Sequence, residues 1–518
     1  MSEMKKKIAD LMAQHSLKRA SECAPKDAPA DHDDASSAKD CASDTAGVAS
    51  GMKPGAPPPD GDVSSINAVA AQAMGGVPSE ESPDDELRRR RRTLLDLSHR
   101  LNLRSGAEWA QEREVLAARL EAGDFEIDRV IPGELVGDGE SRFFLVRRDY
   151  PLDYQQGDLR LGDALQCLSA HVAFSACDPA LADFNPQTAL FMDTETIGLA
   201  GGAGTVAFLV GVGYFAESMF RLDQCFLRDY DDEEAMLHFL AERFTGCGSV
   251  VGYNSKSFDL PLLRTRFIQH RIPFPLEGAP HYDLVHAARR FYKRRLADCS
   301  LGNIERAVLG IHRRGDVPSY LIPQMWFDYL RTRDARPLDR LFYHHRMDVL
   351  SLVSLTGWLS RCLATPDGGG FEHVEDRISL VRLHFRQKQY EQVLAHANAF
   401  LEREERSPLR RECLGLLATA CKRTGRWLEM QQALELLVQE FPGDVGARIE
   451  LAKFHEHRSR DLLKAESLLV EALAAAIPEE GPAIQVRLNR VRGKIARIRR
   501  FSRGGRTSDD DTGELPYA

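Results

Sequence analysis

The sequence predicts an α/β domain, in which helices flank a mixed β-sheet, followed by an all-α helical-repeat domain and preceded by a disordered N-terminus. Three observations support this order. From residue 188 short apolar strands alternate with amphipathic helices. After a PDGGG linker at 366–370 the pattern becomes purely helical and weakly repetitive. Before residue 87 the chain contains no Phe, Trp or Tyr.

The bulk composition excludes several classes of protein. Ten cysteines occur without a C-x-x-C pair, which argues against a zinc ribbon or a thioredoxin-like site. No apolar run reaches about 18 residues, so we expect no membrane span. The basic N-terminus lacks the apolar core of a signal peptide, so we expect a cytoplasmic protein. Because the net charge is −9, any nucleic-acid site must be local.

The N-terminal segments are the least structured part of the sequence. Residues 1–90 form a low-complexity leader that lacks the large apolar groups needed to offset its ordering entropy. It runs into Arg88–Arg92, which we interpret as a solvated charge run, with a nucleic-acid or partner contact as the alternative. In residues 91–185 we expect helices at 94–103 and 109–123 and a strand at 141–151, which together lead into the α/β domain.

The α/β domain is expected over residues 186–364. Its first strand, TALFMDTE, opens onto a glycine-rich turn at 197–204, and this turn lacks the G-K-[ST] ending of a phosphate loop. Further strands and helices follow in alternation, and the spacing of apolar residues predicts a long closing helix. The expected strands are 205–215, 218–229 and 249–254, and the expected helices are 232–244, 259–270 and 338–363.

Residues 371–480 resemble tetratricopeptide-like helical repeats. Tyr390, Trp427 and Leu462 recur at spacings close to the 34-residue period of that family, and small residues recur on the packing faces. Stacked repeats bury a core that one unit could not, and their concave side is typical of protein binding, so a protein partner is a candidate here. The tail over 487–518 is basic and then acidic.

Two carboxylates stand at the end of the first strand of the α/β domain. Because side chains alternate along a strand, Asp193 and Glu195 share one face. A bound cation would remove their mutual repulsion, and hard oxygen ligands suit Mg²⁺ or Mn²⁺. The alternative is an exposed strand end with solvated acids.

Two further motifs supply acids. After strand 249–254, which ends in Asn254, the pair Phe258–Asp259 precedes a helix, and a helix N-cap is the alternative role for Asp259. On the closing helix, His344 and His345 precede Asp348, and an acid there either faces solvent or is neutralised by a partner.

Together the three motifs resemble the DEDD exonucleases, in which D-x-E, N-x-x-x-F-D and a terminal aspartate with a nearby His or Tyr recur in this order. The closest resemblance is to the YprB-like branch of ribonuclease-H-like domains. It is carried by Asp193–Gly198, by HYDLVHAARRFYKRRLADCSLGNIERAVLG at 281–310 and by HHRMDVLSL at 344–352, and it covers roughly 125–360.

The resemblance implies a ribonuclease-H-like fold and a metal-dependent 3′–5′ exonuclease that hydrolyses DNA or RNA by a two-metal mechanism. Asp193, Glu195 and Asp348 would hold one Mg²⁺ or Mn²⁺ ion, and Asp259 would anchor a second that Asp193 bridges. The substrate would be a single-stranded 3′ end. We assign Thr194, Thr196, Asn254 and Phe258 to substrate binding. Asp283 is left open between a supporting and a structural role.

A basic run follows on the next predicted helix. Arg289, Arg290, Lys293, Arg294 and Arg295 surround two aromatic residues, so cations could follow phosphates while rings stack on bases. The alternative is a helix with a solvated basic face.

Helix geometry selects the residue that would activate water. At about 100° per residue, His344 lies about 40° from Asp348, whereas Tyr343 lies about 140° away and His345 about 60° away on the other side. A neutral imidazole accepts protons near neutral pH, so we predict that His344 is catalytic together with Asp193, Glu195, Asp259 and Asp348.

Two other functions stay open. The first is a non-catalytic adaptor in which the helical repeats do the main work, and the second is an endonuclease on the same fold. An adaptor would tend to lose metal ligands, whereas all four acids are present in order. No motif distinguishes DNA from RNA.

Overall fold

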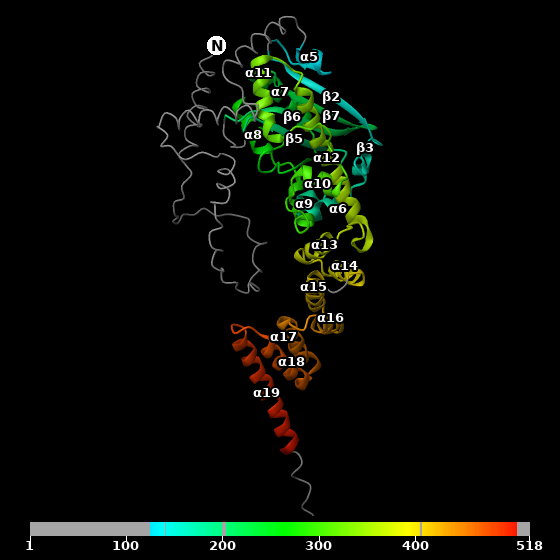
Figure 1. Ribbon diagram of the computed structural model, residues 1–518, viewed down its shortest axis with the longest axis vertical. Helices are drawn as coiled ribbons and strands as arrows, with labels where there is room; N and C mark the ends of the chain where they lie inside the picture. Colours follow the sequence, from blue (N-terminus) through cyan, green and yellow to red (C-terminus); the bar gives the residue numbers. More distant parts are fainter. Residues whose placement is uncertain (1–124, 140, 199–203, 405–406, 505–518) are drawn as a thin grey trace, which may run out of the picture. The chain divides into compact units, whose positions relative to one another are not determined.

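The computed structural model describes residues 125–139, 141–198, 204–404 and 407–504 (Figure 1). The expectations for residues 1–124, most of the glycine-rich turn and the acidic end of the tail lie outside these residues. Among the described helices, none combines the length and the apolar character needed to cross a bilayer.

A seven-stranded mixed sheet forms the centre of the α/β domain and confirms the predicted fold class. Its order is β1-β2-β7-β6-β5-β8-β9, with antiparallel pairs as far as β5 and parallel pairs β5–β8 and β8–β9. The strands are β1 (Glu134–Val136), β2 (Phe143–Pro151), β5 (Ala189–Thr196), β6 (Ala207–Ala216), β7 (Met219–Phe226), β8 (Ser249–Gly252) and β9 (His281–Asp283). A separate ribbon pairs β3 (Gln155–Gln156) with β4 (Leu159–Arg160).

The segment expected to lead into the domain contributes two strands to this sheet. β2 pairs with β7 along eight consecutive positions, from Phe144 opposite Phe226 to Pro151 opposite Met219. Strands β1 and β2 are therefore part of the same sheet as β5 and β6, and not a separate leader. The pairing joins residues about 75 apart in sequence, which local patterns do not reveal.

Helices cover both faces of the sheet, and β5 shows how its sequence divides between them. Phe191 belongs to a hydrophobic cluster with α12, whereas Leu190 and Met192 belong to a second cluster with α7 and α8. This alternation is the period of a strand buried on both sides. The helices are α5 (Ile127–Val130), α6 (Ser169–Ala176), α7 (Glu233–Phe244), α8 (Asp259–Gln269), α9 (Leu284–Tyr292), α10 (Leu301–Val308), α11 (Ile322–Thr332) and α12 (Leu338–Ala364).

Two glycines let α12 approach the sheet closely. A Cβ added to Gly211, on β6, would lie 2.5 Å from Cε1 of His345. A Cβ added to Gly213 would lie 3.0 Å from Cγ1 of Val349. Gly211 is also the register partner of Asp193. Because these two positions of β6 carry no side chain, α12 lies close to the neighbouring strand β5, which carries Asp193 and Glu195.

The predicted all-helical region follows α12. Tyr390, Trp427 and Leu462, which marked the expected repeat, are each the first residue of a helix, namely α14, α16 and α18. The helical character is confirmed, and the tetratricopeptide assignment stays a prediction. The helices are α13 (Val374–Arg386), α14 (Tyr390–Arg403), α15 (Pro408–Thr424), α16 (Trp427–Glu440), α17 (Val445–Phe454), α18 (Leu462–Ala475) and α19 (Gly481–Gly504).

The segment expected as a basic tail forms most of α19. Ile484, Leu488 and Val491 are buried in the core that the helical region shares. Three cations of α19, Arg487, Arg490 and Lys494, form ion pairs with the single carboxylate of Glu456. Residues 481–504 are thus a packed helix, because apolar residues recur with helical spacing between the cations.

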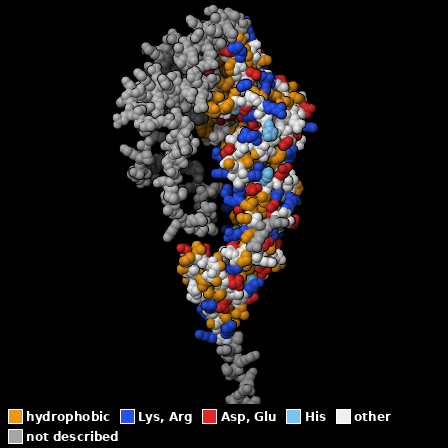
Figure 2. Space-filling model, viewed as in Figure 1, with side chains coloured by type: hydrophobic (Ala, Val, Ile, Leu, Met, Phe, Trp, Pro, Cys, Tyr) orange, Lys and Arg blue, Asp and Glu red, His pale blue; other side chains and the backbone are white. Residues whose placement is uncertain are grey.

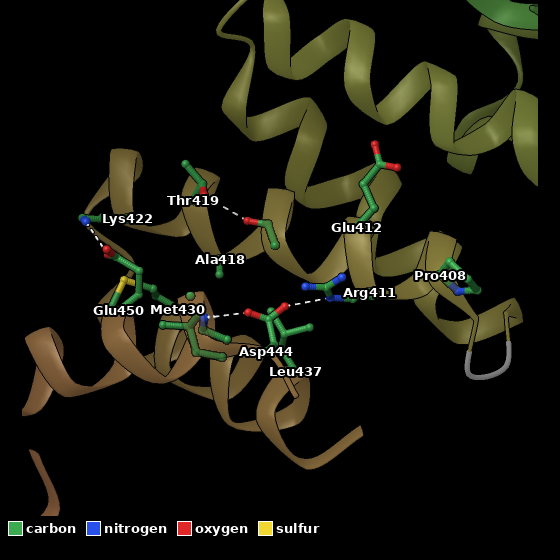
Figure 3. A pocket seen from close by; sticks show the side chains of 14 residues that line it. Pro408, Arg411, Glu412, Ala418, Thr419, Lys422, Met430, Leu437, Asp444 and Glu450 are labelled. Atoms are coloured by element: carbon green, nitrogen blue, oxygen red, sulfur yellow. Dashed lines mark hydrogen bonds and ion pairs between the residues drawn. The ribbon is translucent and has the colours of Figure 1, made fainter. Parts of the chain in front are cut away.

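Within the helical region a cavity of about 470 Å³ lies among α15, α16 and α17 (Figure 3). Its charged lining is largely paired internally. Arg411 contacts Asp444 at 2.8 Å, and Lys422 contacts Glu450 at 2.7 Å. The third acid of the lining, Glu412, pairs with Arg294 and Arg382 outside the cavity, so each charged group of this cavity already has a protein partner.

Candidate metal centre and active site

The four predicted acids come from three elements, β5, α8 and α12, which meet where the interior strand β5 ends. The first half of β5 is buried, and its second half, which carries Asp193 and Glu195, leaves the core. Asp259 is the first residue of α8, and Asp348 lies in the first half of α12. Each of the four side chains is at least four-fifths buried. Tertiary folding therefore gathers carboxylates that are more than 150 residues apart in sequence.

Burial and mutual repulsion make this cluster electrostatically unfavourable without a cation. Burial raises the pKa of Asp193 well above its usual value, and the charges of Asp348, Asp259 and Glu195 add to the rise. Burial, with Asp348 and Asp259, does the same to the pKa of Glu195. Burial raises the pKa of Asp259 to about 6, although its hydrogen bond from Thr194 opposes the shift. Clusters of this kind are typical of metal and catalytic sites.

The donor set fits a divalent cation. Glu195, His344 and Asp348 offer ligand atoms that all lie within 4.8 Å of one another. Asp193 adds a carboxylate beside this group, and Asp259 lies close enough for its charge to act on both acids of β5. Oxygen-rich donor sets favour Mg²⁺ or Mn²⁺, and the imidazole is compatible with the softer of the two.

A buried arginine, Arg313, contacts the acid cluster and does not belong to any of the three predicted motifs. The guanidinium of Arg313 lies 2.5 Å from Oδ1 of Asp348, and it also forms an ion pair with the buried Glu305. Its charge lowers the pKa of Asp193 and Glu195, but not enough to reverse the effect of burial. Ser351 also donates a hydrogen bond to Glu305, at 2.5 Å. Arg313 therefore supplies one fixed positive charge against four acids.

His344 faces the acids from α12. Its Nε2 lies 3.2 Å from Oδ2 of Asp348 and 3.9 Å from Oε1 of Glu195. Its Nδ1 lies 2.8 Å from Oδ1 of Asp316. If Nδ1–H donates to Asp316, the ring is held with Nε2 toward the site, as a carboxylate does for many catalytic and metal-bound histidines.

The two rival residues on α12 point elsewhere. His345 is fully buried: its Nε2 lies 3.1 Å from the carbonyl oxygen of Asp193, and its Nδ1 lies 3.0 Å from Nε2 of Gln224. Burial lowers the pKa of His345 to about 4, so the ring is neutral and fastens α12 to the sheet. Tyr343 lines another cavity with Arg148 and Arg346.

The residues assigned to substrate binding lie around the acids but differ in their contacts. The hydroxyl of Thr194 donates to Asp259, and that of Thr196 donates to the carbonyl of Gly198 at 3.1 Å. Phe258 is 49% exposed directly before Asp259. Asn254 adopts the left-handed conformation, with φ of 63°. Of these four residues Phe258 is exposed, and the other three are half-buried.

Asp283 supports the loop that carries these residues. Its carboxylate accepts hydrogen bonds from the backbone N–H of Asn254 at 2.7 Å and of Lys256 at 3.0 Å. It also caps α9 by accepting from Val285 N–H at 3.2 Å. The structure thus favours a supporting role for Asp283, since two of its three contacts hold the loop that leads to Asp259 and the third caps α9.

The basic run does not act as one unit. Arg289, Arg290, Lys293 and Arg294 line a groove between α9 and α13. Arg295 is turned away from this groove and forms a half-buried ion pair with Asp376, at 2.9 Å. The structure therefore separates Arg295 from the four cations with which it was grouped.

Comparison with known proteins agrees with this geometry. Residues 190–360 match the RNase_H superfamily, so this part of the chain is a domain of a superfamily whose members are typically nucleases and whose fold implies nucleic-acid binding. Over 369 residues the chain is 30% identical to the uncharacterized protein YprB of Bacillus subtilis (strain 168), and the alignment covers 69% of this chain and 87% of YprB. The chain belongs to the same family as YprB.

Three residues of the site were not found from sequence. Glu305, Arg313 and Asp316 lie in or just after α10, where no strand end or repeated spacing marks them. The sole local signal was an acid within the apolar face of α10, since Glu305 is 1% exposed and needs a buried partner.

Proposed function

We propose that the protein is a metal-dependent 3′–5′ exonuclease that hydrolyses phosphodiester bonds of DNA or RNA. The observation that carries the proposal is the convergence of Asp193, Glu195, Asp259 and Asp348, with raised pKa values at the first three, beside His344. The superfamily match supports the class of reaction. The 3′–5′ polarity rests on the resemblance to DEDD exonucleases.

The residues divide the work between ion binding and proton transfer. Asp193, Glu195 and Asp348 would hold one ion, and Asp259 would hold a second that Asp193 shares. Two such ions, when bound, stabilise the attacking and leaving oxygens of an in-line displacement. His344 accepts the proton of the attacking water at Nε2, while Asp316 holds its ring through Nδ1. Thr194 orients the carboxylate of Asp259.

End-labelled strands test the activity and its direction. With Mg²⁺ or Mn²⁺, a 3′-labelled single strand should release a labelled mononucleotide at once, whereas a 5′-labelled strand should give a ladder of shortening products. EDTA should stop both. Labelled fragments of intermediate length from the 3′-labelled strand would indicate an endonuclease, and binding without cleavage would favour a non-catalytic adaptor.

Asp193→Asn provides the matching variant. It removes one charged ligand without changing side-chain volume, so cleavage should fall to background while the fold is kept. Its metal-free melting temperature should rise, because the variant removes repulsion among buried acids. The control is Asp183→Asn, an exposed acid outside the site. Full Mg²⁺-dependent activity in Asp193→Asn would contradict the catalytic assignment.

A further inference from the structure

A groove of about 400 Å³ separates α9 from α13 and is lined almost entirely by basic side chains. One wall belongs to the α/β domain and the other to the first helix of the helical region. In Figure 2 blue side chains gather beside this part of the molecule, while elsewhere on the visible face blue and red are interspersed. The cations are Arg289, Arg290, Lys293 and Arg294 on α9, and Arg382 and Arg386 on α13.

The positive charge of this groove is largely uncompensated. Glu412 pairs with both Arg294 and Arg382, each at 2.8 Å. Among the described residues, no carboxylate forms an ion pair with Arg289, Lys293 or Arg386, all of which are exposed. By contrast, Glu456 alone engages three of the cations of α19. The groove is therefore a place where clustered cations lack protein partners and can meet an anionic ligand.

The two walls are held together by specific contacts. The ring of Phe291 stacks on Phe371 with centroids 5.0 Å apart, and Arg295 pairs with Asp376 at 2.9 Å. Phe371 belongs to the same buried cluster as Phe291. Because the apolar side of α9 is fixed in this way, the backbone that carries its cations beside α13 needs no ordering when a ligand binds.

The groove is continuous in sequence with the edge of the candidate active site. α9 begins at Leu284, directly after Asp283, whose carboxylate holds the loop of Asn254 and Lys256. This loop leads to the exposed Phe258 and to Asp259. The helix that carries the cations at positions 289, 290, 293 and 294 therefore starts directly after a residue that is hydrogen-bonded to this loop.

We propose that α9 and α13 together bind the sugar–phosphate backbone of a single-stranded nucleic acid whose 3′ end lies at the carboxylate cluster. The inference rests on the proposed function and extends it: the helical region becomes part of the substrate-binding surface. A polyanion with regularly spaced charges matches a row of cations better than a folded acidic protein does, and nearby Phe258 offers a ring for base stacking.

Arg386→Glu tests the contribution of α13. Arg386 is exposed and forms no ion pair with a described residue, so its reversal should leave the fold intact. The matched control is Arg423→Glu, an exposed arginine on α15 away from the groove. Both changes are made in the full chain carrying Asp193→Asn, and binding of a fluorescent single strand is followed by anisotropy, which requires no cleavage.

For a strand of about 16 nucleotides, Arg386→Glu should weaken binding about tenfold, the value of one charge-assisted contact, and should lower the salt slope by about 1. Arg423→Glu should change neither. In the catalytically active chain, Arg386→Glu should raise KM for the long strand and leave kcat unaltered. Strands of about 4 nucleotides, too short to reach α13, should be processed as before.

The outcomes separate the two proposals. If the parent chain binds the strand through Arg386 but never cleaves it, the groove assignment stands and the exonuclease proposal fails. If the parent chain cleaves the strand but Arg386→Glu does not weaken its binding, the groove assignment is overturned. The groove assignment is also overturned if a polyglutamate peptide binds through Arg386 and the nucleic-acid strand does not. That result would identify an acidic protein as the ligand.

Discussion

At the scale of single residues, His344 is the side chain whose role is most open to a direct test. Its Nε2 faces Asp348 and Glu195, and its Nδ1 is held by Asp316. Replacement by alanine removes the proton acceptor and should lower the rate by about 10²–10⁴. Single-turnover cleavage with saturating Mn²⁺ measures this loss.

Two further variants distinguish proton transfer from general damage. Tyr343→Phe should be mild, because Tyr343 lines a cavity with Arg148 and Arg346 away from the acids. The loss of rate in Asp316→Asn should lie between those of Tyr343→Phe and His344→Ala, because the variant weakens the contact that orients the ring of His344 but keeps the ring. Metal binding by His344→Ala, followed by calorimetry, should persist through the carboxylates. If Tyr343→Phe is as damaging as His344→Ala, the roles should be exchanged.

At the scale of elements, the approach of α12 to β6 decides whether the site forms. Asp348 and His344 reach Asp193 and Glu195 because α12 lies against Gly211 and Gly213. The ring of His345 fills the space above Gly211 and bonds to the carbonyl of Asp193. The two glycines of β6 therefore set the distance between α12 and β5, which are two of the three elements that carry acids.

Gly211→Ala should be destabilising and should also reduce activity. The added methyl would meet His345 and Val349 at 2.5 and 2.9 Å, so α12 must shift. Such overpacking typically costs about 1–3 kcal/mol of unfolding free energy. Urea denaturation measures the stability loss, and cleavage assays below the transition measure the activity of the folded fraction. Gly493→Ala, at an open position on α19, serves as control. Unchanged stability in Gly211→Ala would mean that α12 packs less closely.

At the scale of the whole molecule, the acid cluster links stability to pH and to metal. Folding raises the pKa values of Asp193, Glu195 and Asp259, so the unfolded chain releases these protons at lower pH than the folded chain does. Stability without metal should therefore fall as pH rises from about 4 through about 6 and beyond. A bound cation favours the ionised acids and should remove this loss.

The rise in melting temperature caused by Mn²⁺, relative to EDTA, should therefore be larger near pH 7.5 than near pH 5, where the acids hold their protons. The buried, neutral His345 changes the stability of the fold in the opposite direction. The stability that it contributes is lost as pH falls from about 6.5 toward about 4. Taking the difference between metal and EDTA at each pH cancels that contribution. Asp193→Asn should reduce the metal effect, and an effect independent of pH would contradict the cluster model.

The family relationship and the overall architecture followed from sequence, because they depend on local patterns. Apolar strands ending in acids, helices of the expected spacing and an all-helical second half all appear in the structure. The strand at 141–151 was predicted, but only its pairing with β7 makes it part of the central sheet. Likewise the basic part of the expected tail belongs to α19, whose apolar residues pack against the helical core.

The sequence by itself determined which acids stand at the ends of elements, because strand alternation and helical spacing are properties of a few neighbouring residues. Asp193, Glu195, Asp259, His344 and Asp348 could be named together because their three motifs, in this order, resemble those of the DEDD exonucleases. Only the tertiary structure decided which groups surround them. Arg313 and Asp316 reach the site through a turn without periodicity, and Arg382 and Arg386 join the α9 cations from another domain. Such contacts depend on long-range packing, to which no local pattern corresponds.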